Sequence, residues 1–209
     1  MEEKFKILIK AILASIMISI GGTIYLSLEN KMVGAFLFSI GLFMICVNGY
    51  NLYTGKIGYI IERKKGYLIE LLITLIGNFI GTVSCGLVLS YTRINSSIKE
   101  VAAKICTIKL NDNLLSIFIL SIFCGMLMYL AVDLYKKKTD FGRYLGIFLG
   151  VTVFILAGFE HCVANMYYFT VADMWEAKTL LYVLIMILGN SVGSIIISKG
   201  HNLIIDSKK

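Results

Sequence analysis

The sequence has 209 residues, of which 58% are hydrophobic and only 16% are charged. Soluble domains average about 45–50% apolar and about 25% charged residues, so this composition indicates an integral membrane protein. The net charge of +7 does not indicate a nucleic-acid partner, because the basic residues lie in loops between hydrophobic runs. About six spans of about 20 residues and short loops use up the chain, so we expect one transmembrane domain over residues 1–209.

Four uninterrupted apolar runs predict spanning helices, at residues 7–28, 67–91, 114–135 and 179–198. The first run follows the N-terminus without a small-residue cleavage pattern, so we interpret it as a spanning helix and not as a removed signal peptide. A polar stretch at residues 92–109 is expected to carry a short helix at about residues 98–108.

Two further apolar runs are interrupted by polar residues at membrane depth. The first covers residues 33–47, meets Asn-Gly-Tyr-Asn-Leu-Tyr-Thr-Gly at 48–55, and resumes over 56–61. The second covers residues 144–156 and resumes over 166–172. Each half is shorter than the about 20 residues that a span needs, so each pair predicts one broken crossing, the second and the fifth of six. The chain has no proline, so glycine and nearby polar residues must make the breaks.

The second break contains an acid, an imidazole and an amide, Glu160, His161 and Asn165, within an otherwise apolar segment. Ionisable side chains at this depth are costly, so His161 is predicted to mark a permeation pathway. The alternative is a hydrogen bond that only packs helices together.

An internal repeat relates the two halves of the chain. The pattern Gly-Asn-x-x-Gly-Thr/Ser occurs at residues 77–82 and 189–194, and the glycines of the two breaks, Gly49 and Gly158, have almost the same separation. A repeat of three helices reverses its orientation in the membrane, so we predict two inverted repeats, at about residues 1–92 and 110–209. The two Gly-x-x-x-Gly patterns are also typical of close helix packing, which is compatible with the repeat.

Basic residues predict a cell-membrane protein with both termini in the cytoplasm, because they are about twice as frequent on that side. The cytoplasmic set is Lys4, Lys6, Lys10, Arg63, Lys64, Lys65, Lys136, Lys137, Lys138, Arg143, Lys199, Lys208 and Lys209. The opposite set is Lys31, Arg93, Lys99, Lys104, Lys109 and Lys178.

Enzymatic chemistry is not indicated, because the chain has no Ser/His/Asp set and no phosphate-binding glycine loop. The five cysteines lack metal-ligand spacing and are expected to be small buried hydrophobes. We therefore expect no metal site and no cofactor.

Residues 158–167, Gly-Phe-Glu-His-Cys-Val-Ala-Asn-Met-Tyr, closely resemble the signature of the formate/nitrite transporter family. Leu-Tyr-Thr-Gly at 52–55 and Gly-Asn-Ser-Val-Gly at 189–193 resemble two further motifs of that family, and the three occur in family order. The resemblance implies an aquaporin-like six-helix subunit in a homopentamer. Each subunit would have its own pore for small monovalent anions such as formate, nitrite or hydrosulfide, which often cross with a proton.

The matching motifs also imply roles for individual residues. His161 is the expected central pore histidine, and Thr54 is its expected partner from the first break. Phe154 is expected at the outer constriction, and Leu52 and Tyr53 at the inner one, where Tyr53 replaces the usual phenylalanine. For Phe154, Leu52 and Met128 the alternative is an ordinary core or lipid-facing residue, and for Thr54 it is the cap of a half-helix.

Lys109 matches the family's lysine before the fourth span, with Lys104 as the fallback and a solvated loop charge as the alternative. Three positions depart from the family pattern. Gly125 replaces an asparagine expected to line the pore, Met128 lies at the constriction, and Asn51 replaces the usual glutamate. These departures favour a weakly hydrated anion such as hydrosulfide over formate.

Glu160, Asn165, Asn51, Gly158 and Gly55 are expected to support the breaks. The same role is expected of two more amides, Asn78 and Asn190. In the implied mechanism, Lys109 concentrates anions at the outer mouth. Half-helix N-termini at both breaks direct positive dipole ends at the path, and His161 supplies a hydrogen bond or a proton.

The leading prediction is therefore a channel or carrier for small monovalent anions, with proton linkage through His161. One alternative is a pore for water or neutral solutes on the same architecture, which electrogenic or proton-linked flux would exclude. Another is a non-transporting membrane scaffold, which has no use for polar interruptions at the membrane midplane.

Overall fold

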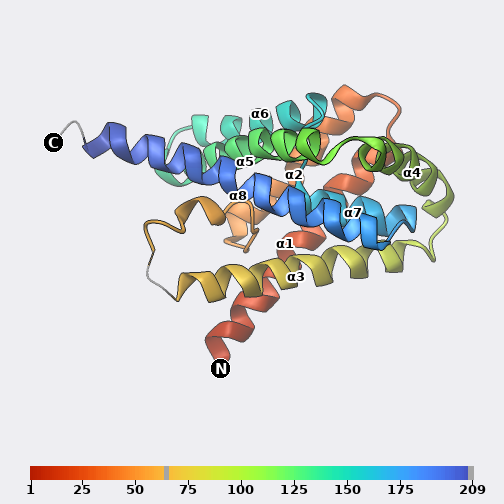
Figure 1. The fold of residues 1–209 in the computed structure, drawn as a ribbon, viewed down its shortest axis with the longest axis horizontal. Helices are drawn as coiled ribbons and strands as arrows, with labels where there is room; N and C mark the ends of the chain where they lie inside the picture. The colour runs from red at the N-terminus through yellow and green to blue at the C-terminus, as the bar shows by residue number, and fades with distance from the viewer. Residues whose placement is uncertain (64–65, 207–209) are drawn as a thin grey trace.

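The computed structural model describes residues 1–63 and 66–206, and every regular element in these ranges is helical (Figure 1). The charges expected to orient the chain at Lys64, Lys65, Lys208 and Lys209 lie outside these ranges. The elements are α1 (Glu2–Ser27), α2 (Lys31–Asn48), η1 (Ile57–Tyr59), α3 (Tyr67–Leu89), α4 (Asn95–Asn111), α5 (Leu114–Lys137), α6 (Gly142–Leu156), α7 (Cys162–Ala172) and α8 (Ala177–Asp206).

Five of these helices, α1, α2, α3, α5 and α8, are long and apolar enough to cross a membrane, which confirms the prediction of an all-helical membrane chain. α6 and α7 have 15 and 11 residues and are each shorter than a span. Several helices extend beyond their predicted ends: α1 begins at Glu2 and α8 continues to Asp206. Hydropathy detects the apolar part of a helix, whereas backbone hydrogen bonding continues into the polar residues on either side.

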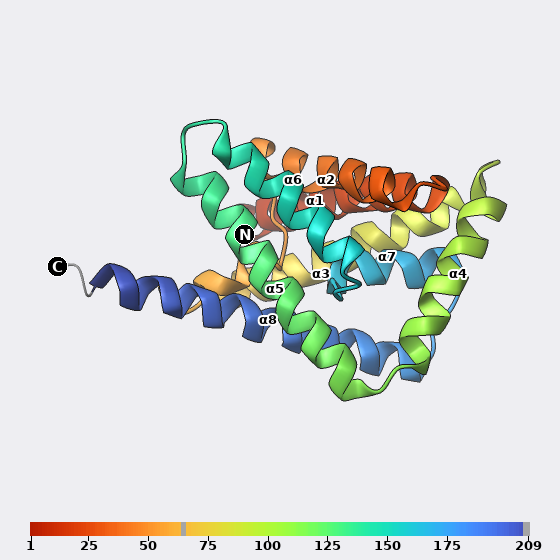
Figure 2. The ribbon, with the colours of Figure 1, turned by 90° about the horizontal axis from the view of Figure 1, so that it is seen from above.

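The helices form two groups that contact each other along the middle of the molecule (Figures 1 and 2). α1 packs against α2 and α3, and α5 packs against α6 and α8. The groups meet where α2 packs against α6, α3 against α7, and η1 against α8. α4 lies across one end of the bundle, where it contacts α7 (Figure 2).

Glycines bring the helices of each group close together. A Cβ at Gly81 of α3 would overlap the Ser15 side chain of α1, and a Cβ at Gly193 of α8 would overlap the Ile122 carbonyl oxygen of α5. Only glycine permits this approach of the backbones, so the two Gly-x-x-x-Gly patterns form helix-packing surfaces.

Both breaks occur at the predicted glycines. Gly49 has φ +63° and Gly158 has φ +71°, in the left-handed region that favours glycine. The N–H of Tyr50 donates to the Ile45 carbonyl at 2.9 Å, and the N–H of Phe159 donates to the Phe154 carbonyl at 2.9 Å. At both breaks the chain thus leaves its helix through the same kind of glycine C-cap.

The chain does not continue in the same way after the two breaks. α7 follows the second break as an 11-residue α-helix, but the first break is followed only by the three-residue 3₁₀-helix η1. The expectation of a half-helix N-terminus at both breaks is therefore wrong for the first. Gly55 and Gly58 weaken helix propensity here, and a Cβ at Gly58 would overlap the Tyr129 ring, so the segment is shaped by packing against α5.

Candidate functional site

A histidine and a threonine join the two breaks at the centre of the molecule. His161 Nε2 lies 2.9 Å from Thr54 Oγ1, and both residues are buried. His161 is also the N-cap of α7, where its Nδ1 accepts the backbone N–H of Ala164 at 3.1 Å. Because Nδ1 accepts, the ring proton of the neutral histidine is on Nε2, and His161 donates to Thr54. Thr54 is therefore bonded to His161 and does not cap a helix.

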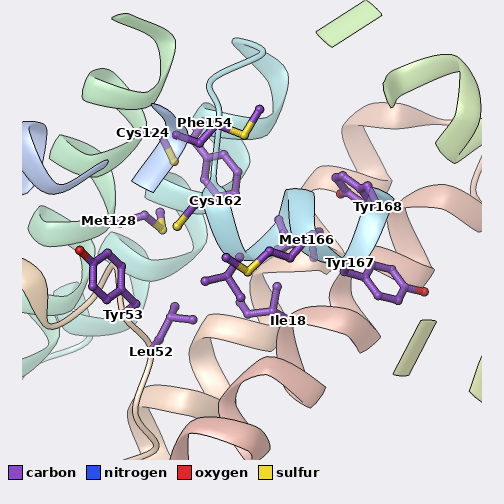
Figure 3. Packing of buried hydrophobic residues seen from close by; sticks show 14 of the residues in the cluster. Ile18, Leu52, Tyr53, Cys124, Met128, Phe154, Cys162, Met166, Tyr167 and Tyr168 are labelled. Atoms are coloured by element: carbon purple, nitrogen blue, oxygen red, sulfur yellow. The ribbon is translucent and has the colours of Figure 1, made fainter. Parts of the chain in front are cut away.

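The pair is enclosed by apolar side chains. The ring of Phe154 stacks on the His161 ring with centroids 5.5 Å apart, and Phe38 packs edge-on against Phe154. Leu52 and Met128 are each 2% exposed. Figure 3 shows Met128 between Phe154 and Leu52. The central pair thus lies beside an apolar barrier that is formed by Phe154, Leu52 and Met128.

A cavity approaches this barrier from each side. The Gly158 cavity has a volume of about 130 Å³, and the Gly49 cavity has a volume of about 210 Å³. The Gly158 cavity is lined by Tyr25, Ile105, Lys109, Phe154, Ile155, Gly158, Phe159, His161, Ala164, Asn165 and Tyr168. The Gly49 cavity is lined by Ile45, Cys46, Gly49, Tyr50, Asn51, Leu52, Gly55, Lys56, Val132, Tyr135 and Lys136. His161 lines one cavity, and its partner Thr54 lies in the chain between Leu52 and Gly55, which line the other.

Lys109 is part of a buried ion pair beside the Gly158 cavity. Its Nζ lies 2.6 Å from Glu160 Oε2, and the same oxygen accepts from Asn165 Nδ2 at 2.7 Å. The two charged side chains are only 13% and 4% exposed. Lys109 thus lines the Gly158 cavity as expected of a residue near a pore mouth, but its charge is compensated by Glu160, so its role in concentrating anions stays a prediction.

Lys104, the fallback for Lys109, lies on the exposed side of α4. It pairs with Glu100 at 2.6 Å, and both side chains are about 70% exposed. The hydrogen bond from Lys104 lowers the pKa of Glu100. This pair does not line either cavity.

An asparagine from α3 holds the first break. Asn78 Oδ1 accepts the N–H of Tyr53 at 2.9 Å, and its Nδ2 donates to the carbonyls of Ala11 at 2.7 Å and Asn51 at 3.0 Å. The bonds to Tyr53 and Asn51 satisfy backbone groups that lack helical partners at the break, and the bond to Ala11 joins α3 to α1.

An asparagine from α8 holds the second break in the same way. Asn190 Oδ1 accepts the N–H of Cys162 at 2.9 Å, and its Nδ2 donates to the carbonyls of Ser121 and Glu160, both at 2.8 Å. Each asparagine thus ties a break to two helices, which explains why the Gly-Asn dipeptide recurs in the sequence.

A second ion pair, which is partly buried, lies beside the Gly49 cavity, and sequence reasoning missed it. Lys56 pairs with Glu70 and also donates to Asn51 Oδ1 at 3.1 Å. Asn51 occupies the position expected to carry glutamate, so the carboxylate that faces Lys56 comes from α3. Glu70 follows no motif, and its position in the first turn of α3 was the only signal.

Two of the predicted pathway positions, Gly125 and Tyr53, have contacts away from the cavities, whereas Gly55, which was expected to support a break, lines the Gly49 cavity. A Cβ at Gly125 would overlap the carbonyl oxygen of Asn190, so glycine here allows α5 and α8 to approach. The Tyr53 hydroxyl lies 2.9 Å from Ser191 Oγ, and a Cβ at Gly55 would lie 3.1 Å from Val132 Cγ2.

Within residues 1–63 and 66–206, no group of three or more His, Cys, Asp or Glu could hold a metal ion. All five cysteines are free, and Cys106, Cys124 and Cys162 are buried.

Known protein families, curated proteins and solved structures include several that are similar to this chain. Residues 2–203 match the family model described as formate/nitrite transporter. The chain is similar to the formate channel FocB of Escherichia coli (strain K12), with 24% identity over 79% of this chain and 66% of FocB. It is similar to the formate-nitrite transporter of Plasmodium falciparum (isolate 3D7), with 27% identity over 93% of this chain and 76% of that protein.

Its fold is similar to a solved structure described as a pentameric formate channel with formate bound. The TM-score is 0.82 at 21% identity, and the match covers 98% of both chains. The chain spans about two thirds of the length of several curated relatives: 66% of FocB, and 65% and 64% of the transporters of Plasmodium knowlesi and Plasmodium malariae.

Proposed function

Because the chain belongs to the formate/nitrite transporter family, we propose that it conducts small monovalent anions across a membrane along the line of its two cavities. The observation that carries this proposal is the barrier between the cavities, where His161 and Thr54 form a buried polar pair among apolar side chains. A scaffold would gain nothing from a polar pair at this depth.

The barrier favours a permeant that crosses without net charge. An anion loses its hydration among Phe154, Met128 and Leu52, and the cost is large in an apolar constriction. We infer that the anion crosses as its conjugate weak acid, which forms when the anion takes a proton from hydronium in the solution outside the barrier and leaves water behind. In this arrangement Nδ1 of the neutral His161 accepts the N–H of Ala164, so the ring proton stays on Nε2, where it is donated to Thr54.

We propose that α6 and α7 together form one broken crossing, which gives six crossings in one transmembrane domain over residues 1–209. Residues 1–92 and 110–209 are then inverted aquaporin-like repeats. The bonds at the breaks support this, since Asn78 and Asn190 make matching contacts with Tyr53 and Cys162. An even number of crossings places both termini on one side, and the basic clusters favour the cytoplasmic side of the cell membrane.

We propose that the assembly is a homopentamer. The similar solved structure is described as pentameric, and its match to 98% of this chain supports the same assembly here. The many exposed apolar side chains of α2, α3 and α8 provide surface for lipid and for neighbouring copies.

Formate, nitrite and hydrosulfide are the candidate permeants. The apolar character of the barrier favours hydrosulfide, which is the most weakly hydrated of the three. A pore for water or neutral solutes on the same architecture is the competing function.

The test is flux into liposomes that contain the purified protein, for all three anions, between about pH 5 and about pH 8. We expect selective anion uptake that decreases as pH rises, because the protonated fraction of each weak acid decreases. Protein-free liposomes correct for direct diffusion of the acid. Water permeation without any anion uptake beyond that control would replace this proposal with the neutral-solute pore.

A further inference from the structure

Tyr53 is held at both of its ends by different helices. Its backbone N–H donates to Asn78 of α3 at 2.9 Å, and its hydroxyl lies 2.9 Å from Ser191 Oγ of α8. Ser191 Oγ donates its own proton to the Ile187 carbonyl at 2.6 Å. The Ser191 oxygen is therefore an acceptor toward Tyr53, so the tyrosine hydroxyl donates. Tyr53 thus connects α3 in one half of the chain to α8 in the other.

The neighbours of Tyr53 in the chain form part of the barrier. Leu52 lines the Gly49 cavity, and Thr54 bonds to His161. Tyr53 itself lines neither cavity. Figure 3 shows Leu52 and Tyr53 leaving the same loop in different directions, with the tyrosine oxygen directed away from Leu52. The hydroxyl therefore acts on the barrier only through the backbone that it holds.

We propose that the Tyr53 hydroxyl is a positioning group that fixes the size limit of the barrier by holding Leu52 and Thr54 in place through Ser191. This inference rests on the proposed anion transport. The break has no α-helix after Thr54, only the three-residue η1. Side-chain anchors must therefore supply the rigidity that a continuing helix would give. When Leu52 is held less firmly, a larger monocarboxylate passes the barrier more easily.

The experiment measures the ratio of acetate flux to formate flux in liposomes. Tyr53→Phe and Ser191→Ala each remove one side of the hydrogen bond and keep the rest of the residue. We expect each variant to raise the acetate-to-formate ratio by about threefold to tenfold, the factor that one lost hydrogen bond gives. The double variant should raise the ratio no further than either single change, because both remove the same bond.

Ser194→Ala is the matched control, since it makes the same change one turn further along α8, where the serine donates to the Gly125 carbonyl and not to Tyr53. It should leave the ratio unchanged. An unchanged ratio in both single variants, additive effects in the double variant, or the same increase in Ser194→Ala would each overturn the proposal.

Hydrogen exchange of residues 51–56 gives a second readout that does not require transport. Tyr53→Phe and Ser191→Ala should accelerate amide exchange in this segment, and Ser194→Ala should not. If the wild-type protein transported neither anion, the proposed function would fail. The exchange rates would then still show whether the hydrogen bond between Tyr53 and Ser191 holds residues 51–56 in place. In protein that transports, accelerated exchange with an unchanged flux ratio would show that the hydrogen bond between Tyr53 and Ser191 does not set the size limit of the barrier.

Discussion

At the scale of single residues, His161 has two structural duties that constrain its chemistry. Its Nδ1 caps α7 and its Nε2 bonds to Thr54, so both nitrogens are already engaged. A proton added to Nδ1 would break the cap and place a positive charge at the positive end of the α7 dipole. Its single N–H is therefore available to a passing solute only when that solute displaces Thr54 as the acceptor.

Two substitutions of His161 separate the cap from the donor. Asparagine is a good N-cap but is too short to keep the bond to Thr54, whereas alanine loses both. We expect His161→Ala to lower the unfolding free energy by about 1 kcal/mol relative to His161→Asn. Formate flux should fall in both variants. Thermal unfolding in detergent and liposome flux measure the two effects, and equal stability of the variants would remove the capping role.

The ion pair of Lys109 and Glu160 predicts a large and non-additive effect on stability. Removing one partner of a buried pair leaves an uncompensated charge, so Lys109→Met should cost about 3–5 kcal/mol. The double variant Lys109→Met/Glu160→Gln should recover part of that loss. Lys104→Met is the control on the same helix, and its melting temperature should equal that of the wild type because its pair with Glu100 is exposed. An equally stable Lys109→Met would contradict a buried pair.

At the scale of elements, the glycines have two different structural roles. Gly49 and Gly158 end helices through a positive φ, whereas Gly81 and Gly193 lie inside helices and admit a neighbouring backbone. Gly49 and Gly158 end α2 and α6 and so produce the two breaks. The second kind holds α1 against α3 and α5 against α8, so that Asn78 and Asn190 reach the breaks.

Two glycine-to-alanine changes in α8 test this packing. A Cβ at Gly193 overlaps the Ile122 carbonyl, while a Cβ at Gly200 meets nothing within 4 Å. We expect Gly193→Ala to lower the unfolding free energy by about 1–3 kcal/mol or more through overpacking. Gly200→Ala should be neutral or should stabilise the helix by up to about 1 kcal/mol, since alanine favours helix. Similar melting temperatures for the two variants would show that α5 and α8 are not closely packed at Gly193.

At the scale of the whole molecule, the sequence predicted the helical membrane class, the two breaks and the family. It succeeded because apolar runs, interrupted at Gly49 and Gly158, directly reflect the cost of polar groups in a membrane. It did not predict the pairing of Lys109 with Glu160, because 51 residues separate them and only the folded chain brings α4 to the second break. It also did not predict the ion pair of Lys56 and Glu70, or that only a three-residue 3₁₀-helix follows the first break, because both depend on packing between elements.

We propose that permeation passes through the barrier between the two cavities. Formate flux through Phe154→Ala in liposomes tests it most directly, because this side chain stacks on His161 and lines the Gly158 cavity. Phe141→Ala is the control with the same change at a side chain that is 70% exposed. We expect flux several times that of the wild type in Phe154→Ala, with little change in the preference among anions, and wild-type flux in Phe141→Ala. Unchanged flux through folded Phe154→Ala would place the permeation pathway elsewhere.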